Sequence, residues 1–301
     1  MPDGGLLFLH ALTGLHPGSG AALDAIDLPV QRERHTSWPL IPGSSLKGVL
    51  RAATKVGDER DEDHKNCWLT VFGPETVTDT ESHAGAITVT DARILAFPVR
   101  SLQGVFAWAT CPAVLTRLAQ DVKLAPGTLS LPAEMPQVVD GEILCAPDTL
   151  VINDETVVLE EYDFHRRGNY EAWATALAAR ITGDAALQDR FKARLAILSD
   201  NDFGHFVRYA TEVTARIGLE AWTKTVKNGA LFYQEVLPPE TLFYSVIRSE
   251  HRTGTPKEME AAAAMDWLRE TVPDVIQIGA DETIGRGFCA TRMHRPAQGG
   301  A

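Results

Sequence analysis

The sequence predicts an α+β fold. Short segments that are apolar, or that alternate between apolar and polar residues, are typical of strands, as in residues 5–13 and 85–101. Between them lie stretches with apolar residues at helical spacing, such as residues 43–55 and 112–124. Apolar residues make up 45% of the chain, which is enough for a core of ordinary size. The length of 301 residues permits one large domain or two smaller ones.

The first half of the chain is expected to supply most of the strands. Residues 5–13 form a strand that ends at the turn HPGSG, and residues 38–42 are extended because prolines bound them. The charged residues 58–65 predict a surface loop. Residues 85–101 predict two strand segments joined near Asp91, and residues 105–109 predict another strand.

In the second half of the chain, the expected helices and strands alternate less regularly. We expect an irregular segment at residues 125–139, a hairpin at 150–159 turning near Asn153, alanine-rich helices at 170–179 and 185–198, a helix at 258–268, short strands at 274–278 and 288–293, and a disordered tail from Arg295. The two alanine-rich helices are interpreted as an insertion that packs on the core.

A long hairpin is the clearest local prediction. Residues 212–226 and 230–244 are both rich in strand-forming residues, and Lys227-Asn228-Gly229 lies between them. Asn-Gly between two such arms is the strongest short hairpin signal. Because the arms are long for an ordinary hairpin, we expect the tip to project, carrying Lys224, Thr225 and Val226. Taken alone, the same tip is equally well explained as a solvated hairpin end.

Composition limits the compartment and the partners. No apolar run is long enough to span a bilayer, and the N-terminus shows no basic leader or cleavage site. The four cysteines are widely spaced without a CxxC pair, which favours reduced thiols and a cytoplasmic location. The net charge of −12 argues against tight binding of nucleic acid by an isolated chain, but permits a local basic groove.

Two glycine turns carry the candidate binding residues. The first opens the helix predicted at residues 43–55, where Ser44 or Ser45 can cap the N-terminus and Lys47 and Arg51 share one face. Free amides at a helix N-terminus form an anion site, although the spacing is not that of a nucleotide P-loop. The second turn lies at residues 278–288 and contains Arg286. A further basic and polar path comprises Arg93, Arg100, Ser101 and Gln103.

Other titratable residues carry weaker signals. His10 and His16 are explained as a core residue and a turn residue, and Asp27, taken alone, as a loop acid that caps a turn. Asp24 is its nearest competitor. His64 and Cys67 have HxxC spacing and His83 follows, but no second close pair completes a zinc site.

The two glycine turns, IPGSSLKGVLR and IGADETIGRGF, resemble the RAMP superfamily of CRISPR RNA-binding proteins, which is marked by a glycine-rich loop after the last helix. DLPVQRERHTSWPLIPGSSLKG, TDARILAFPVRSLQGVFAW, SDNDF and NGALFYQEVLPPETLFY further resemble the backbone subunit of type III-B (Cmr) effector complexes. These blocks extend from Leu15 to about Cys289. The resemblance implies an RRM/ferredoxin-like palm formed by one domain, residues 1–301, with insertions at about 58–85 and 125–200 and a thumb hairpin at about 212–244.

The resemblance also implies a function. Copies of such a subunit stack into a filament along a CRISPR guide RNA beside other Cmr subunits, and each thumb displaces one base pair of the guide–target duplex. An acid matching Asp27, assisted by His16 and Glu235, then supports cutting of the target RNA with Mg²⁺ or Mn²⁺ held at Asp27. Unstacking a nucleotide can supply the in-line geometry that a stacked strand denies. The implied RNA-binding residues are Ser44, Ser45, Lys47, Arg51, Arg93, Arg100, Ser101, Gln103, Lys224, Thr225, Val226 and Arg286.

Two alternatives remain at this stage. In the first, the chain is a purely structural guide-binding subunit, which differs from the nuclease only in the role of Asp27. In the second, it is a stand-alone ribonuclease that trims guide precursors, a reaction that usually relies on a His or Lys pair without a metal ion.

Overall fold

A large mixed sheet forms the body of the molecule. The computed structural model describes residues 3–21, 25–55, 61–75, 83–125, 129–153 and 155–294. Strand β1 (Asp3–Ala11) lies between β12 (Leu242–Ser249) and β14 (Phe288–His294), and both pairings are antiparallel. Its sequence GLLFLHA is almost entirely buried, which explains why so apolar a segment becomes a central strand.

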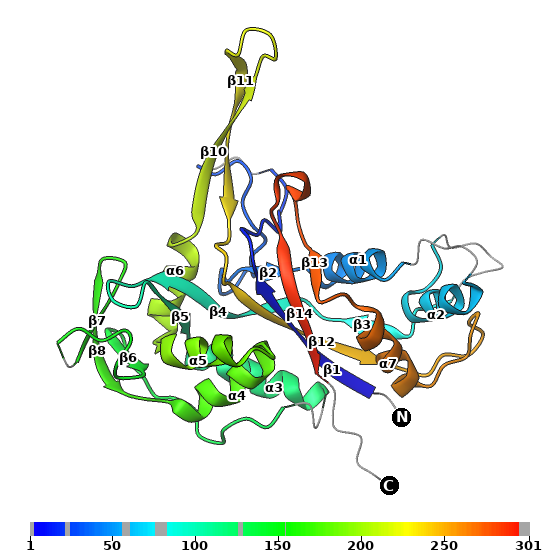
Figure 1. Cartoon of the computed structure of the whole chain (residues 1–301), viewed down its shortest axis with the longest axis horizontal. Coiled ribbons are helices and arrows are strands. Elements are labelled where there is room, and N and C mark those ends of the chain that lie inside the picture. Colours follow the sequence, from blue (N-terminus) through cyan, green and yellow to red (C-terminus); the bar gives the residue numbers. More distant parts are fainter. Residues whose placement is uncertain are drawn as a thin grey trace.

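The sheet continues on both sides of these three strands (Figure 1). On the β14 side it ends at β13 (Val275–Gln277). On the β12 side the order is β4 (Ala92–Arg100), β5 (Phe106–Thr110), β9 (Leu195–Leu198), β6 (Glu142–Cys145), β8 (Tyr162–Gly168) and β7 (Thr156–Leu159). Two short strands lie off this path: β2 (Leu40–Ile41) pairs with β4, and β3 (Ile87–Val89) pairs with β12.

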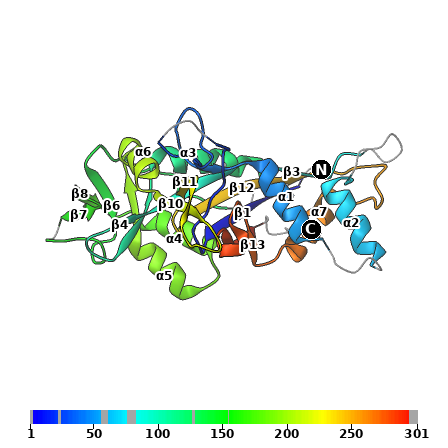
Figure 2. The same ribbon diagram turned by 90° about the horizontal axis from the view of Figure 1, so that it is seen from above.

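Helices pack on the sheet and on each other. Helix α7 (Ala261–Thr271) packs on β1 and β12, α4 (Glu171–Ile181) on β1 and β14, and α5 (Ala185–Arg194) on β5, while α3 (Pro112–Asp121) and α6 (Asp200–Tyr209) contact β4. Helices α1 (Gly43–Ala53) and α2 (Glu62–Phe72) lie together at the end of the molecule where β3 and α7 are found (Figures 1 and 2). Single 3-10 turns occur at η1 (Val122–Leu124) and η2 (Glu282–Ile284). Within the described ranges, no helix combines the length and the apolar character needed to cross a membrane.

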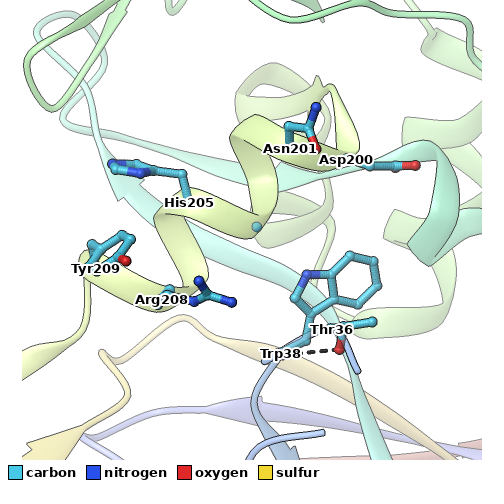
Figure 3. Close-up of a pocket in the computed structure, with 8 residues that line it drawn as sticks. Thr36, Trp38, Asp200, Asn201, His205, Arg208 and Tyr209 are labelled. Atoms are coloured by element: carbon cyan, nitrogen blue, oxygen red, sulfur yellow. Dashed lines mark hydrogen bonds between the residues drawn. The ribbon is translucent and has the colours of Figure 1, made fainter. Parts of the chain in front are cut away.

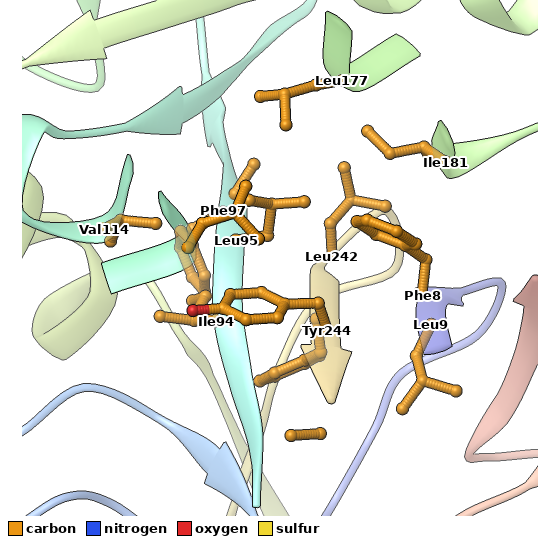
Figure 4. Packing of buried hydrophobic residues seen from close by; sticks show 14 of the residues in the cluster. Phe8, Leu9, Ile94, Leu95, Phe97, Val114, Leu177, Ile181, Leu242 and Tyr244 are labelled. Atoms are coloured by element: carbon orange, nitrogen blue, oxygen red, sulfur yellow. The ribbon is translucent and has the colours of Figure 1, made fainter. Parts of the chain in front are cut away.

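The core lies between the sheet and these helices. Phe8 and Leu242, from neighbouring strands, point toward Ile181 of α4 (Figure 4). Phe97 is fully buried on β4, and Tyr244 is nearly so on β12. Each large apolar side chain buried in this way contributes roughly 1.5–3 kcal/mol. Burial of these side chains therefore stabilises the central sheet.

A two-stranded hairpin stands out of this body (Figure 1). Strands β10 (Glu212–Leu219) and β11 (Val226–Val236) pair with each other, Gln234 of β11 also bridges Leu28, and Trp222 at the tip is 95% exposed. We call this hairpin the thumb. The predicted projection is thus present, but the second arm ends at Val236 rather than at residue 244. Pro238 and Pro239 follow, and they cannot donate ladder hydrogen bonds, so the chain turns before β12 begins.

The turn of the thumb is not at Asn228-Gly229, as the sequence predicted. Leu219 pairs with Val226, and the Glu220 amide donates to the Thr225 carbonyl at 2.8 Å, so the chain reverses between them. Because Ile217 pairs with Leu231, residues 227–230 have only Gly218 opposite them. Gly229 has a φ of +73° in this irregular stretch. A bulge accepts a left-handed glycine as readily as a type I′ turn does, and this one keeps Lys224 and Thr225 at the tip.

Several other predicted boundaries were wrong. The helix predicted to reach residue 198 ends at Arg194, because LAIL becomes the fully buried strand β9, parallel to β5. Residues 62–65, predicted as loop, begin α2, which the Asp61 side chain caps. The hairpin near Asn153 is a single bridge between Ile152 and Thr156; the longer hairpin is β7–β8. Strand β6 and helix α6 were not predicted. Asp24, Asp154 and the tail from residue 295 lie outside the described residues.

Candidate RNA-binding and cleavage surface

Asp27 lies against the base of the thumb. Its segment runs along β11, where the Leu28 amide donates to the Tyr233 carbonyl at 3.0 Å and the Glu235 amide donates to the Leu28 carbonyl at 2.9 Å. The Tyr233 amide in turn donates to Asp27 Oδ2 at 2.7 Å. One carboxylate oxygen is therefore held by the thumb backbone, while the residue stays half-buried and reachable from solvent. The position of Asp27 depends on that of the thumb.

Glu235, predicted as a catalytic helper, is a buried structural residue. Its carboxylate accepts hydrogen bonds from Arg32 Nη2, from the Thr211 hydroxyl at 2.9 Å and from the Val30 amide at 3.0 Å. Only 4% of its side chain is exposed. With both oxygens occupied inside the protein, Glu235 has no access to a substrate. The geometry favours a role in tying the 30–32 segment to the thumb base.

His16, the other predicted helper, is also buried. Its Nδ1 lies 2.6 Å from the Glu235 carbonyl oxygen, so Nδ1 carries the proton in that contact. The His16 carbonyl accepts from the Ala280 amide at 3.1 Å. A Cβ at Gly279, where φ is +83°, would lie 2.3 Å from that carbonyl oxygen, so only glycine permits the approach. His16 therefore joins the HPGSG turn to residues 278–287, which we call the glycine-rich loop.

Arg216 connects the thumb to the glycine-rich loop. Its Nη1 donates to Gln234 Oε1 and to Asp281 Oδ1, both at 2.6 Å. The side chains of Arg216 and Asp281 are 26% and 16% exposed. Burial acts to raise the pKa of Asp281, but hydrogen bonds from Arg216 and Gln234 and the nearby Arg286 charge outweigh it and hold the pKa below its usual range. Gln234 is adjacent to Tyr233, so this ion pair and Asp27 are held by neighbouring residues of β11.

Replacing Asp281 with asparagine should lower the free energy of unfolding by about 1–3 kcal/mol at neutral pH, because a partly buried charged hydrogen bond is lost. The folded pKa of Asp281 lies below its unfolded pKa. This stabilisation is therefore complete above about pH 5 and decreases as the pH falls through the folded pKa. Urea unfolding of both proteins between pH 7 and pH 3 measures it. The exposed neighbour Glu282→Gln serves as control, and a constant difference at every pH would contradict the ion-pair account.

Helix α1 presents the predicted phosphate-binding residues. Ser44 and Ser45 are exposed in its first turn, but neither caps it: Pro42 precedes the helix, and Asp91 Oδ1 accepts from the Gly43 amide at 2.7 Å. The prediction of a serine cap was wrong. The Ser44 and Ser45 amides follow in the first turn, where no intrahelical acceptor exists. They remain available to an anion.

The two cations of α1 are partly withdrawn from solvent. Lys47 Nζ donates to the Ile87 carbonyl at 2.9 Å, and burial lowers its pKa with help from the Arg51 charge. The Arg51 guanidinium lies 4.1 Å from the Trp68 ring centre, and burial lowers its pKa. Among the described residues, Arg51 Nη2, Arg286 Nη1 and Arg252 Nε are buried nitrogens without a hydrogen-bond acceptor. Because leaving such donors unpaired is costly, Arg51 and Arg286, which lie at the two glycine turns, favour an acceptor from outside the chain, such as a phosphate oxygen.

The four residues of the predicted basic and polar path lie in separate parts of the structure. Arg93, whose side chain is 38% exposed, donates to both oxygens of Asp121 at 2.9 and 2.7 Å, and Asp121 also accepts from the Tyr244 hydroxyl. Arg100 is 72% exposed at the far end of β4, where its Nη2 lies 3.1 Å from Glu160. The other two members of the path, Ser101 and Gln103, lie in the loop after β4, buried and exposed respectively. That loop adjoins β7, and α1 is at the opposite end of the molecule (Figure 1). The structure thus keeps Arg100, Ser101 and Gln103 away from the glycine turns, whereas Arg93 pairs with Leu40, close to the turn that opens α1.

The thumb tip presents the predicted wedge. Lys224 and Thr225 are in the turn, and Val226 begins β11 with 54% of its surface exposed. Trp222 is a larger apolar group at the tip that no motif in the sequence indicated. Arg216, Tyr233 and Asp281 were also not predicted. Their roles depend on contacts between residues far apart in the sequence, and only the glycine-rich motif around Asp281 gave a local signal.

The histidines and the cysteine with weak sequence signals make internal contacts. His64 Nε2 lies 2.9 Å from the Thr54 carbonyl oxygen, His83 Nε2 lies 3.1 Å from that of Leu69, and Cys67 is buried. His10 is in the core, 2.7 Å from Glu240. Within the described segments, no three His, Cys, Asp or Glu side chains gather as ligands for a metal ion.

Comparison with known proteins assigns the family. A model of the RAMP superfamily matches residues 8–290. The chain belongs to the RAMP superfamily. A relative from Pyrococcus furiosus, described as the CRISPR system Cmr endoribonuclease Cmr4, is 39% identical to this RAMP protein over 299 residues, covering 98% of this chain and 97% of the relative.

Solved structures agree with this assignment. The crystal structure of oligomeric Cmr4 from P. furiosus superimposes on this RAMP chain with a TM-score of 0.75 at 30% identity, covering 98% of this chain and 99% of the other. A chain of the type III-B Cmr-beta complex bound to cognate target RNA matches with a TM-score of 0.72 at 21% identity, covering 96% of each chain, which is a likeness of fold. The RAMP palm and the α+β class predicted from sequence are confirmed.

Proposed function

We propose that this RAMP protein is the guide-RNA-binding backbone subunit of a type III-B CRISPR (Cmr) effector complex, and that it cuts complementary target RNA at regular intervals. One observation supports this most strongly: Asp27 is fixed to the base of a projecting thumb by the Tyr233 amide at 2.7 Å. The extensive similarity to a protein named as a Cmr endoribonuclease and to an oligomeric Cmr4 supports the same activity and stacking of copies along the guide. Other Cmr subunits complete the assembly.

In this proposal α1 and the glycine-rich loop hold guide phosphates. The exposed Ser44 and Ser45 lie at the start of α1, and α1 packs beside β13, which leads into the glycine-rich loop. Arg51 and Arg286 each retain an unpaired buried nitrogen for an acceptor. Contacts of this kind read the regular backbone rather than the bases, so many guide sequences fit. Repetition along a filament adds up the few cations of each acidic chain.

Cutting follows from the thumb and Asp27 together. The thumb tip unstacks one nucleotide of the target, which frees its 2′-hydroxyl to approach the adjacent phosphorus in line with the leaving 5′-oxygen. Asp27, half-exposed beside the thumb base, is placed to accept the hydroxyl proton or to hold an ion at that phosphate. His16 and Glu235 contribute by positioning the loops around it, since both side chains are buried.

The residues present fit a divalent ion only in partnership with RNA. Asp27 offers one carboxylate, and Mg²⁺ typically takes one or two carboxylates while phosphate oxygens and water fill its other positions. Such an ion supplies Lewis-acid stabilisation of charge on the phosphate. Mn²⁺ suits the same oxygen ligands.

Removing divalent ions with EDTA should abolish cutting by the assembled complex, and added Mg²⁺ or Mn²⁺ should restore it, because the account places an ion at Asp27. Gel analysis of a labelled target measures the rate, and guide binding in EDTA provides the control. Full cutting in EDTA would refute the metal requirement and favour a metal-free ribonuclease such as a guide-trimming enzyme.

The four cysteines agree with a reducing compartment. All four are buried free thiols, and burial raises the pKa of Cys145 to about 11, so it is unreactive at neutral pH. We therefore place the complex in the cytoplasm.

A further inference from the structure

A pocket lies beside the thumb base, between α6 and the segment that leads into β2 (Figure 3). It encloses about 410 Å³ and is lined by Trp38 on one side and by residues of α6 on the other. We call it the α6 pocket. Its volume is within the range of small-ligand sites, roughly 300–1,000 Å³. None of the functions assigned above uses it.

Gly204 in the α6 pocket has no structural explanation in the folded chain. It lies in the interior of α6, where glycine is among the least favourable residues. Its φ is not positive, and a Cβ there would make an ordinary contact of 3.7 Å with Trp38 Nε1. Neither the backbone nor packing therefore requires glycine. The missing side chain keeps the wall of the pocket open, which points to an occupant.

The mouth of the pocket presents a cluster of aromatic rings and a cation. His205 lies edge-on to Tyr162 and tilted against Tyr209, with ring centres 5.1 and 4.9 Å away. Tyr209 is 67% exposed, and the Arg208 guanidinium lies 5.9 Å from its ring centre. Exposed aromatic faces with arginine are the chemistry on which unpaired nucleobases stack. At the other end of the pocket lies Asn201, whose amide nitrogen donates to Asp140 Oδ2 at 3.0 Å (Figure 3).

One guanidinium joins this pocket to the site of cutting. Arg32 Nη1 donates to the Ser37 carbonyl at 2.7 Å and to the Val207 carbonyl at 2.9 Å, one in each wall. Its Nη2 donates to Glu235, two residues from the Tyr233 amide that holds Asp27. In the view from above, α6 and the segment before β2 lie together beside the thumb (Figure 2). An occupant of the α6 pocket would thus be next to the Asp27 loop.

We propose that the α6 pocket binds one unpaired nucleobase of the target RNA, the base that the thumb displaces. The inference rests on the proposed function, and it adds a place for the displaced nucleotide. Holding that base would keep the adjacent 2′-hydroxyl oriented toward its phosphate. The competing occupant is an apolar side chain from a second copy of the chain, such as Trp222. The lining includes the Asp200 carboxylate, but its exposed aromatic ring and the Arg208 guanidinium favour a base.

The test uses complexes assembled with Asp27→Asn protein, a guide and a target that carries 2-aminopurine at the displaced position. Stacking against the aromatic rings should quench this probe. In the Tyr209→Ala and Gly204→Leu backgrounds, its fluorescence should rise several-fold and target binding should weaken by roughly 5- to 100-fold, as expected for loss of one stacked base. Exposed His251→Ala at the other end of the molecule is the surface control.

Unchanged fluorescence and target binding in both pocket variants would overturn the proposal. So would separation of the copies, measured by sedimentation without target, since that would make the pocket an interface between copies. Because the probe is read in Asp27→Asn complexes, it does not depend on cutting. Failure of wild-type protein to cut would reject the proposed function separately, through a rate assay on unmodified target.

Discussion

Target cutting by the assembled complex is expected to fall by roughly 10²–10⁴-fold when Asp27 is replaced by alanine, the range typical for loss of a positioned acid or base. Guide binding should not change, because Asp27 lies at the thumb base and the predicted phosphate contacts are on α1 and the glycine-rich loop. Single-turnover cleavage of a labelled target and a gel-shift assay with guide RNA measure the two quantities.

Asp27→Asn separates charge from position. Its amide oxygen can still accept from the Tyr233 amide, so the loop should stay in place while the negative charge is lost. An equal loss of cutting in both variants shows that the charge is required. Asp274→Ala, an exposed loop acid before β13, is the matched control and should cut normally. Normal cutting at the same spacing by Asp27→Ala would support the alternative of a purely structural guide-binding subunit.

Shortening the thumb should abolish regular cutting and leave guide binding intact. Because Ile217 and Leu231 are paired, residues 218–230 can be replaced by Asn-Gly, which closes the hairpin directly after that pair. The removed tip is exposed, including Trp222, so the fold of the body should not depend on it. Without the tip the target duplex stays stacked, and its 2′-hydroxyls cannot reach in-line geometry.

Melting temperature and guide affinity are the controls for the shortened thumb. The single substitution Trp222→Ala keeps the length of the hairpin. It therefore distinguishes the effect of hairpin length from that of the apolar side chain at the tip. Equal loss of guide binding and cutting would contradict a wedge, since it would show that the tip holds the guide. Cutting that persists at regular spacing would show that unstacking does not depend on the thumb.

Local pattern was sufficient for much of the fold. The apolar segment of β1, the helical spacing in α1 and α3, and the break at Asp91 between β3 and β4 each contain their own signal, so the elements form where predicted. LAIL in β9 was different. Those four residues fit a helix continuing from α5, and only burial between β5 and β6 makes them a strand. Helix α6 was not predicted, although its start carries a local signal: Ser199 caps the helix at Asp202, and Phe203 and Phe206 follow at helical spacing.

The candidate site was predictable in its motifs and not in its contacts. The glycine-rich motifs located α1 and the glycine-rich loop, and the resemblance drew attention to Asp27. Arg32 with Glu235, and Arg216 with Asp281, are 203 and 65 residues apart in sequence. No local pattern predicts such pairs, because each depends on how the thumb base is docked. The same docking buries His16 and Glu235, which turns two predicted catalytic helpers into positioning residues.

The most direct test is a structure of the Asp27→Asn protein assembled with guide and uncut target RNA. We expect each thumb tip to enter the duplex and the residue 27 side chain to lie within hydrogen-bonding reach, directly or through one water, of the phosphate beside the displaced nucleotide. A target strand that passes far from residue 27, or a thumb tip that lies outside the duplex, would contradict this expectation.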